Sequence, residues 1–230
     1  ISNQTGSSFD WIAAQDNRLC GVTTLGGIEC FGGGSPPEDK PANGFTTVSA
    51  SANYACGIRG EEMECWGYDP PDLPIGVTTF QSISTASNAA CSLDEDGAIS
   101  CWGTDTYSSP RSKWDKIDIT NGTHCGVAEE KLYCWGDLNP LETQAPVGES
   151  FVSLSVAEQY VDDFDMGRGL CALTKYGAIE CSCCKTTAFS ENVCSQADNL
   201  DVCRYQPSET VPLIQVAVGN SYACALGTDG

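Results

Sequence analysis

Apolar residues recur along the chain in a pattern typical of short strands. A leading apolar residue is followed three positions later by a second one, then by a cysteine, and then by a second cysteine nine or ten positions further on. Phe80, Ile83, Cys91 and Cys101 are one example. Because strand side chains alternate with period two, Cys91 and Leu93 share one face. The pattern predicts antiparallel strands joined by tight turns.

Six copies of this pattern cover the chain. They occupy about residues 9–34, 45–69, 80–105, 114–138, 151–184 and 213–230, and residues 1–6 are expected to complete the last copy. The first cysteines of successive copies are 36, 35, 34, 46 and 53 residues apart, so the two long intervals are local insertions. Short strands and glycine-rich turns at a period of roughly 35–40 residues predict an all-β fold. We expect a six-bladed β-propeller in one domain, residues 1–230.

The paired cysteines set the expected register of each hairpin. If Cys91 lies opposite Cys101, Leu93 faces Ile99 and the turn is Glu95-Asp96-Gly97, with glycine where a positive φ is needed. Directly opposed residues are close enough for a disulfide. The predicted bridges, one in most blades, are Cys20–Cys30, Cys56–Cys65, Cys91–Cys101, Cys125–Cys134 and Cys171–Cys181. The two shorter copies leave the turns Gly60-Glu61, which suits type II′, and Glu129-Glu130, an unfavourable turn pair.

The repeat resembles that of the regulator-of-chromosome-condensation superfamily. The resemblance is carried by Tyr54-Ala55-Cys56-Gly57-Ile58, by Cys65-Trp66-Gly67 and by the segment from Tyr222 to Gly230. The resemblance covers essentially the whole chain. The repeat is similar above all to secreted, cysteine-bearing versions such as the ectodomains of crinkly-type plant receptor kinases. The resemblance implies a propeller closed by strands from both chain ends. It implies no single function, because one fold hosts many roles. Such family members usually have seven blades, whereas this chain has six copies.

Cysteine content and sequons indicate an oxidising compartment. The chain has 15 cysteines but a single histidine, His124. The regular pairs lack the short spacing of zinc knuckles, so we expect disulfides and a secreted or cell-surface, extracellular protein. Sequons at Asn3 and Asn121 predict a glycoprotein, with Asn121 the expected site. A start at Ile1 fits either a processed secretory chain or a fragment.

Charge excludes several classes of partner. The chain carries 11 Lys+Arg against 31 Asp+Glu, a net charge of −20. A protein this acidic does not neutralise phosphates, so we expect no nucleic acid and no anionic membrane surface among its partners. This argues against the nucleotide-exchange and chromatin-binding roles of the nuclear family members. No apolar run reaches the ~18 residues that span a bilayer, so no membrane insertion is expected within this segment.

The last copy stops at the turn of its hairpin, which leaves two ways to close the ring. The segment 1–6 can supply the missing strand within the same chain, in which case Asn3 takes the place of the second cysteine. The same strand can instead complete the last blade of a neighbouring molecule. Repeated head to tail, such donation builds a filament.

A second group of cysteines lies in a cysteine-rich loop, residues 183–212. Its members are Cys183, Cys184, Cys194 and Cys203. We expect two further disulfides, although four cysteines allow three pairings; a metal knuckle that includes Cys181 is the alternative. Seven bridges use fourteen cysteines, and Cys224 is the expected odd one, either buried and inert or paired between chains.

An acidic insertion interrupts the fifth copy between residues 158 and 166. Three carboxylates close together could bind calcium, but no EF-hand spacing supports this. We therefore expect no metal, and a solvated loop that serves as a contact surface. The candidate contact residues are Tyr160, Asp162, Asp163, Phe164 and Asp165.

The sequence gives little support for enzyme chemistry. His124 occupies a strand position filled elsewhere by residues such as Ala55 and Ala90, so a structural role is favoured over catalysis. With 31 acids, a glycosidase-like carboxylate pair carries no information. No phosphate-binding glycine loop is present, so no cofactor is expected. Three tryptophans at one repeat position could stack on carbohydrate, but their repetition favours packing: Trp66, Trp102 and Trp135.

The sequence therefore predicts a non-enzymatic, extracellular structural or protein-recognition propeller. Its expected partners are other proteins or copies of itself, together with N-linked glycans. A finer hypothesis makes it a subunit of a larger assembly or filament that forms through N-terminal strand donation. The alternative is a monomeric carbohydrate- or peptide-binding ectodomain of the lectin or receptor type.

Overall fold

The computed structural model describes residues 7–15, 18–32, 43–74, 76, 79–104, 106–136, 150–161, 165–182, 194–197, 200–205, 212–219 and 222–229. All the regular structure in these ranges is β-structure. Within the same ranges no helix is long and apolar enough to cross a membrane. The secondary structure therefore agrees with the all-β prediction.

The described strands form six antiparallel sheets, which we call blades 1 to 6 in chain order. The innermost strands are β1 (Phe9–Gln15), β4 (Thr47–Ala50), β7 (Ser82–Thr85), β10 (Lys116–Thr120), β13 (Phe151–Val161) and β18 (Leu213–Gly219). The second strands are β2 (Arg18–Thr23), β5 (Tyr54–Arg59), β8 (Ala89–Leu93), β11 (Thr123–Ala128), β14 (Asp165–Thr174) and β19 (Tyr222–Gly227). The third strands are β3 (Ile28–Gly32), β6 (Glu62–Gly67), β9 (Ile99–Gly103), β12 (Lys131–Gly136) and β15 (Ile179–Ser182).

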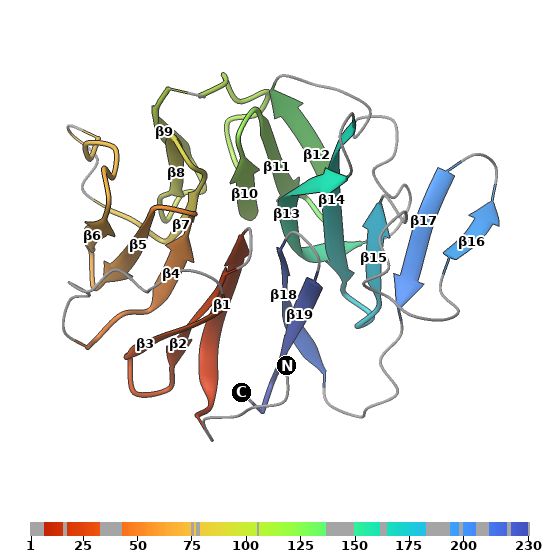
Figure 1. Ribbon diagram of the computed structural model, residues 1–230, viewed down its shortest axis with the longest axis horizontal. Coiled ribbons are helices and arrows are strands. Elements are labelled where there is room, and N and C mark those ends of the chain that lie inside the picture. The colour runs from red at the N-terminus through yellow and green to blue at the C-terminus, as the bar shows by residue number, and fades with distance from the viewer. Residues whose placement is uncertain are drawn as a thin grey trace.

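The six blades surround a common centre, as the view down the axis shows (Figure 1). Each innermost strand contacts the innermost strand of the next blade, from β1 to β4 and onward to β18. The strand β18 in turn contacts β1, so the inner ring of strands closes within one chain. This is the arrangement of a β-propeller.

The hairpin registers are those that the cysteine spacing predicts. Cys91 lies opposite Cys101 and Leu93 opposite Ile99, and Gly97 has a φ of 77° in the turn between them. The shorter hairpin of blade 4 pairs Ala128 with Lys131, so the turn consists of two glutamates. The pairing of the two strands therefore determines the length of the turn, even where the turn residues are poorly suited to it.

The hydrophobic core lies between blades rather than at the centre of the ring. The disulfide-bearing face of one blade packs on the alanine- and tryptophan-bearing face of the next, as Cys20 and Val22 do against Ala55 and Trp66. The same packing joins blade 6 to blade 1, where Leu226 contacts Ile12. The core thus closes around the ring together with the strands.

The glycine that follows the first cysteine of several copies has a packing role. A Cβ built on Gly57 would lie 2.6 Å from the ring of Phe45, the leading apolar residue of its copy. The same clash would occur at Gly126, 2.4 Å from the ring of Trp114. The leading aromatic residue therefore needs glycine beside it in these blades, which explains the recurring Cys-Gly pair.

Blade 5 corrects two sequence predictions. The segment 183–212 was expected to be a loop, yet β16 (Cys194–Ala197) and β17 (Leu200–Tyr205) lie within it and extend the sheet in the order β13-β14-β15-β17-β16. The acidic insertion was expected to be a loop as well. Its described residues, 158–161 and 165–166, instead belong to the paired strands β13 and β14, in which Glu158 faces Arg168 and Val161 faces Asp165. In both places, pairing with a neighbouring strand provides hydrogen-bond partners for backbone N–H and C=O groups of the inserted residues.

Candidate binding site at the centre of the propeller

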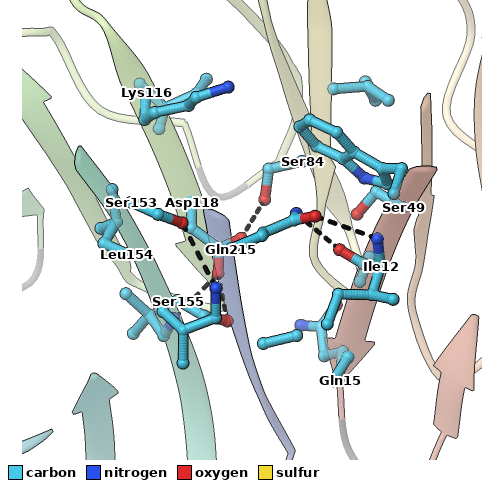
Figure 2. A pocket seen from close by; sticks show the side chains of 18 of the residues that line it. Ile12, Gln15, Ser49, Ser84, Lys116, Asp118, Ser153, Leu154, Ser155 and Gln215 are labelled. Atoms are coloured by element: carbon cyan, nitrogen blue, oxygen red, sulfur yellow. Dashed lines mark hydrogen bonds between the residues drawn. The ribbon is translucent and has the colours of Figure 1, made fainter. Parts of the chain in front are cut away.

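The innermost strands enclose a central cavity of about 230 Å³ (Figure 2). The repeat explains its lining, because the residue after the second apolar position of every copy faces the cavity. These residues are Ala13, Ser49, Ser84, Asp118, Ser155 and Ala217. Small and polar side chains at this position leave the centre open, while the apolar positions beside it pack between blades.

Serine and aspartate side chains in the cavity wall bind the backbone of the next blade. The Ser49 Oγ accepts a hydrogen bond from the Thr85 N–H at 3.0 Å. In the same way Ser84 accepts one from the N–H of Ile119, also at 3.0 Å. The Ser155 Oγ accepts one from the Val218 N–H at 3.0 Å. These bonds form a belt that joins successive innermost strands.

Two other side chains complete the belt on either side of β1. The Gln215 amide accepts a hydrogen bond from the Ile12 N–H at 3.0 Å and donates one to the Ile12 carbonyl at 2.7 Å, and thereby joins blade 6 to blade 1 (Figure 2). The Trp11 Nε1 donates to the Val48 carbonyl at 2.9 Å and joins blade 1 to blade 2. With the bond from the Val156 N–H to the Asp118 carboxylate, which joins blade 4 to blade 5, every junction between the six described blades has a bond between a side chain and the adjacent backbone.

Asp118 is the acidic member of the belt and links three blades. Its carboxylate accepts hydrogen bonds from the Ser84 hydroxyl at 2.6 Å and the Ser155 hydroxyl at 2.9 Å. It also accepts from the N–H groups of Val156, at 2.8 Å, and Ile119, at 3.0 Å. Burial raises the pKa of the Asp118 carboxyl above its ordinary value, although the four hydrogen bonds oppose this shift.

Lys116 reaches across the cavity from blade 4 to blade 1. Its Nζ lies 5.1 Å from the centre of the Trp11 ring, a cation–π distance. Burial lowers the pKa of the Lys116 ammonium, and the carboxylate of Asp115 acts in the opposite direction. The cavity therefore contains an amine, a carboxylate and several hydroxyls, but the belt uses the carboxylate and the hydroxyls to hold the blades together.

Sequence reasoning missed Asp118, Lys116 and Gln215. One signal was present, because Asp118 stands where three other copies have serine. Their role depends on the backbone of the neighbouring blade, which the period within one copy does not reveal.

The five predicted hairpin disulfides are present. The bridges Cys20–Cys30, Cys56–Cys65, Cys91–Cys101, Cys125–Cys134 and Cys171–Cys181 have Cα–Cα distances of 4.0 to 4.1 Å. Cys224 is a free thiol on the second strand of blade 6 and is half-buried. Burial raises the pKa of the Cys224 thiol above its ordinary value.

Other predicted site residues lie outside the described side chains. Residues 1–6 with Asn3, the cysteines at 183 and 184, and residues 162–164 are outside the described ranges. For Tyr160, Asp165, Cys194 and Cys203 only the strand register is described, and it places Cys203 opposite both Cys181 and Cys194. The second sequon is described: Asn121 is half-buried, and its Oδ1 accepts a hydrogen bond from the Ser87 N–H at 3.1 Å.

His124 and the three tryptophans occupy structural positions. The His124 side chain is fully buried, and its ring packs edge-on against Tyr107 and Trp135. Its nitrogen lies near the sulfurs of Cys91 and Cys101, but these are joined in a disulfide and offer no thiolate to a metal. Trp66, Trp102 and Trp135 are only 6 to 8% exposed, so they pack between blades and do not form a carbohydrate-stacking surface.

Known structures share this fold. The ectodomain of the receptor kinase CR4 from Physcomitrella patens matches with a TM-score of 0.62 and 22% identity over 94% of this chain and 58% of the other. The CRINKLY ectodomain of the Arabidopsis thaliana receptor kinase ACR4 matches with a TM-score of 0.56 and 21% identity over 94% and 74%. Yeast RCC1 (Prp20), in a structure with Kap60, matches with a TM-score of 0.61 and 12% identity over 98% and 67%.

These matches concern the fold, and no protein-family model or curated protein sequence matches the chain. The chain spans 58% of the length of the moss ectodomain. The predicted repeat, the hairpin disulfides and the closed ring of strands all agree with the same architecture. The chain is a β-propeller, similar in fold to the CR4 and ACR4 receptor kinase ectodomains and to yeast RCC1.

Proposed function

We propose that the chain is a non-enzymatic recognition domain of an extracellular protein and that its ligand is another protein. Five disulfides are stable where the surroundings are oxidising, as they are outside the cell. The crinkly-type ectodomains that share the fold support the same compartment. N-glycosylation at Asn121 is part of this proposal.

The observation that carries the proposal is the contrast between the centre and the rim of the propeller. The Asp118 carboxylate and the serine hydroxyls of the cavity wall are engaged in bonds between blades. Large apolar side chains stand exposed on the turns instead, with Leu25 87% and Tyr176 72% exposed. Large exposed apolar patches mark protein contact surfaces, and we propose that Leu25 and Tyr176 belong to such a surface.

The finer hypothesis of a filament subunit concerns the edge strand β19. Among the described residues the sheet of blade 6 has two strands, so β19 has one neighbour there. If a second copy donated its N-terminal strand, that strand would pair with the edge of β19 that has no neighbour among the described residues. Deletion of residues 1–5 followed by native mass measurement tests this: loss of multimers supports donation, and an unchanged size contradicts it.

The recognition role is tested by cross-linking on the outside of cells. The chain, secreted from eukaryotic cells with its disulfides intact, is expected to form a stoichiometric cross-link to one or a few extracellular proteins. Endoglycosidase treatment is expected to lower its mass, and Asn121→Gln to remove that shift. Retention of the chain in the cytosol with reduced cysteines would refute the extracellular role, and the absence of any cross-linked protein would refute recognition.

A further inference from the structure

The turns that join second to third strands lie on one side of the ring, which we call the hairpin face. The Thr24 N–H donates to the Ser8 carbonyl at 3.0 Å, and the Lys175 N–H donates to the Ser150 carbonyl at 2.8 Å. Each bond ties a turn to the segment where an innermost strand begins. The cavity wall includes Asp10 and Ile214 from these strand starts, so the cavity reaches the hairpin face.

Among the described residues, the exposed large apolar side chains of the hairpin face all belong to blades 5, 6 and 1. Leu25 and Tyr176 occupy the turns of blades 1 and 5, and Val152 and Ile214 lie at the starts of β13 and β18. Blades 5, 6 and 1 are consecutive in the ring, because β13 contacts β18 and β18 contacts β1 (Figure 1). We call these four residues the apolar half. Their side chains are 41 to 87% exposed.

Acidic residues occupy the other half of the same face. The turns of blades 2, 3 and 4 expose Glu61, Glu62, Glu95, Asp96, Glu129 and Glu130. Glu129 pairs with Arg111 at 3.3 Å and Glu130 with Lys175 at 2.9 Å. Among the described residues no ion pair involves Glu61, Glu95 or Asp96. We call these turns the acidic half.

We infer that the hairpin face binds a protein segment that carries an apolar anchor next to lysine or arginine residues, with the anchor on the apolar half and the basic residues on the acidic half. This inference rests on the proposed function, because it gives the recognition domain a surface and a ligand chemistry. A few desolvated side chains, most often Trp, Tyr or Arg, supply most of the affinity of an interface, and complementary charge supplies orientation and association rate. The net charge of −20 disfavours nucleic acid and anionic lipid as occupants.

The opposite face offers matched controls. The Tyr68 N–H donates to the Asn53 carbonyl at 2.9 Å, and Asn53 lies in the turn between β4 and β5. This turn is at the end of the innermost strand, so Tyr68 lies on the face of the ring opposite the hairpin face. Its side chain is 79% exposed, about as much as that of Tyr176. Asp72 follows on the same segment and is an exposed acid. Both can be changed without touching the core.

The experiment selects ligands from a display library of 12-residue peptides on the intact, oxidised chain. We expect selected peptides to carry an apolar residue beside lysine or arginine. The double variant Leu25→Ser, Tyr176→Ser is expected to weaken binding of the synthesised peptides about 10- to 30-fold, and Tyr68→Ser to leave it unchanged. The double variant Glu95→Lys, Asp96→Lys is expected to lower both the affinity for these peptides and the dependence of that affinity on salt concentration. The control Asp72→Lys is expected to change neither.

Circular dichroism and the mass of the non-reduced chain confirm that each variant is folded. Peptides that bind equally well to the hairpin-face variants but lose affinity for Tyr68→Ser would overturn the inference, as would a selection that yields acidic peptides or none. The proposed function fails separately, through the absence of any cross-linked extracellular protein. A protein partner that cross-links only to the opposite face would therefore retain recognition and overturn the hairpin face as its site.

Discussion

Replacement of Asp118 tests whether the central belt stabilises the propeller. In Asp118→Asn one carboxylate oxygen becomes an NH₂ group. Each oxygen of the native carboxylate accepts a backbone N–H, one from Ile119 at 3.0 Å and one from Val156 at 2.8 Å. With the NH₂ toward Val156, the Val156 N–H loses its acceptor; with the NH₂ toward Ile119, the Ser84 hydroxyl loses its acceptor, and the Ile119 N–H keeps only its bond to the Ser84 Oγ. A buried donor without a partner costs about 1–3 kcal/mol, so we expect Asp118→Asn to lower the free energy of unfolding by about 2 kcal/mol.

The larger change Asp118→Ser is expected to lower the free energy of unfolding by less than Asp118→Asn does. Serine occupies the same repeat position in three other blades, where its Oγ accepts the N–H of the next innermost strand at 3.0 Å. In blade 4 the new hydroxyl can accept from Val156 in the same way, and the hydroxyls of Ser84 and Ser155 can rotate toward other acceptors. We therefore expect Asp118→Ser to remain within about 1 kcal/mol of the native chain.

Denaturant unfolding with intact disulfides measures both variants. Five tryptophans provide the fluorescence signal, and an unchanged slope against denaturant indicates that the same surface unfolds. The reasoning would be refuted if Asp118→Asn were as stable as the native chain at pH 7, or if Asp118→Ser were the less stable of the two. Either result would show that the belt bonds do not set the stability of the ring.

The pH dependence of the same comparison has a defined sign. Because burial raises the folded-state pKa of Asp118 above its unfolded value, the folded chain takes up this proton first. The contribution of Asp118 to stability is thus fully present below the unfolded pKa and is lost as the pH rises through the folded pKa. The stability of the native chain minus that of Asp118→Ser should increase when the pH is lowered from neutral toward 4. A difference that stays constant or decreases contradicts a raised pKa.

Three further predictions concern the ring junction, the hairpins and one turn. Gln215→Ala removes both bonds to Ile12 and should lower the free energy of unfolding by about 2 kcal/mol; hydrogen exchange should accelerate in β1, and unchanged exchange there would count against the junction. The double variant Cys56→Ser, Cys65→Ser opens one bridge and should cost about 2–3 kcal/mol in denaturant unfolding, so a native-like midpoint would show that the hairpin needs no bridge. Glu129→Asn with Glu130→Gly should stabilise the chain by about 1 kcal/mol, because both glutamates have a positive φ; a lower melting temperature would contradict this.

The sequence contained enough information to predict the hairpins but not their connections around the ring. Opposed cysteines and period-two alternation gave the register of Cys91 and Cys101, because both signals lie within one copy. The bonds of Asp118 join residues of three copies, and Gln215 lies 203 positions from Ile12. No local pattern reports contacts over such separations. The strands β16 and β17 were missed for a similar reason, since their pairing depends on the exposed edge of β15.

The repeat also determines where differences between blades can accumulate. Cysteine pairs, the glycine beside the leading aromatic residue and the buried tryptophans recur because each blade must pack on the next. The exposed turn positions on the hairpin face do not pack on a neighbouring blade: blades 1 and 5 expose Leu25 and Tyr176 there, while blade 3 exposes Glu95. The fold does not require this division into an apolar and an acidic half. Because the exposed turn positions vary while the packing positions recur, the turns are the part of the chain in which we expect a specific partner to be encoded.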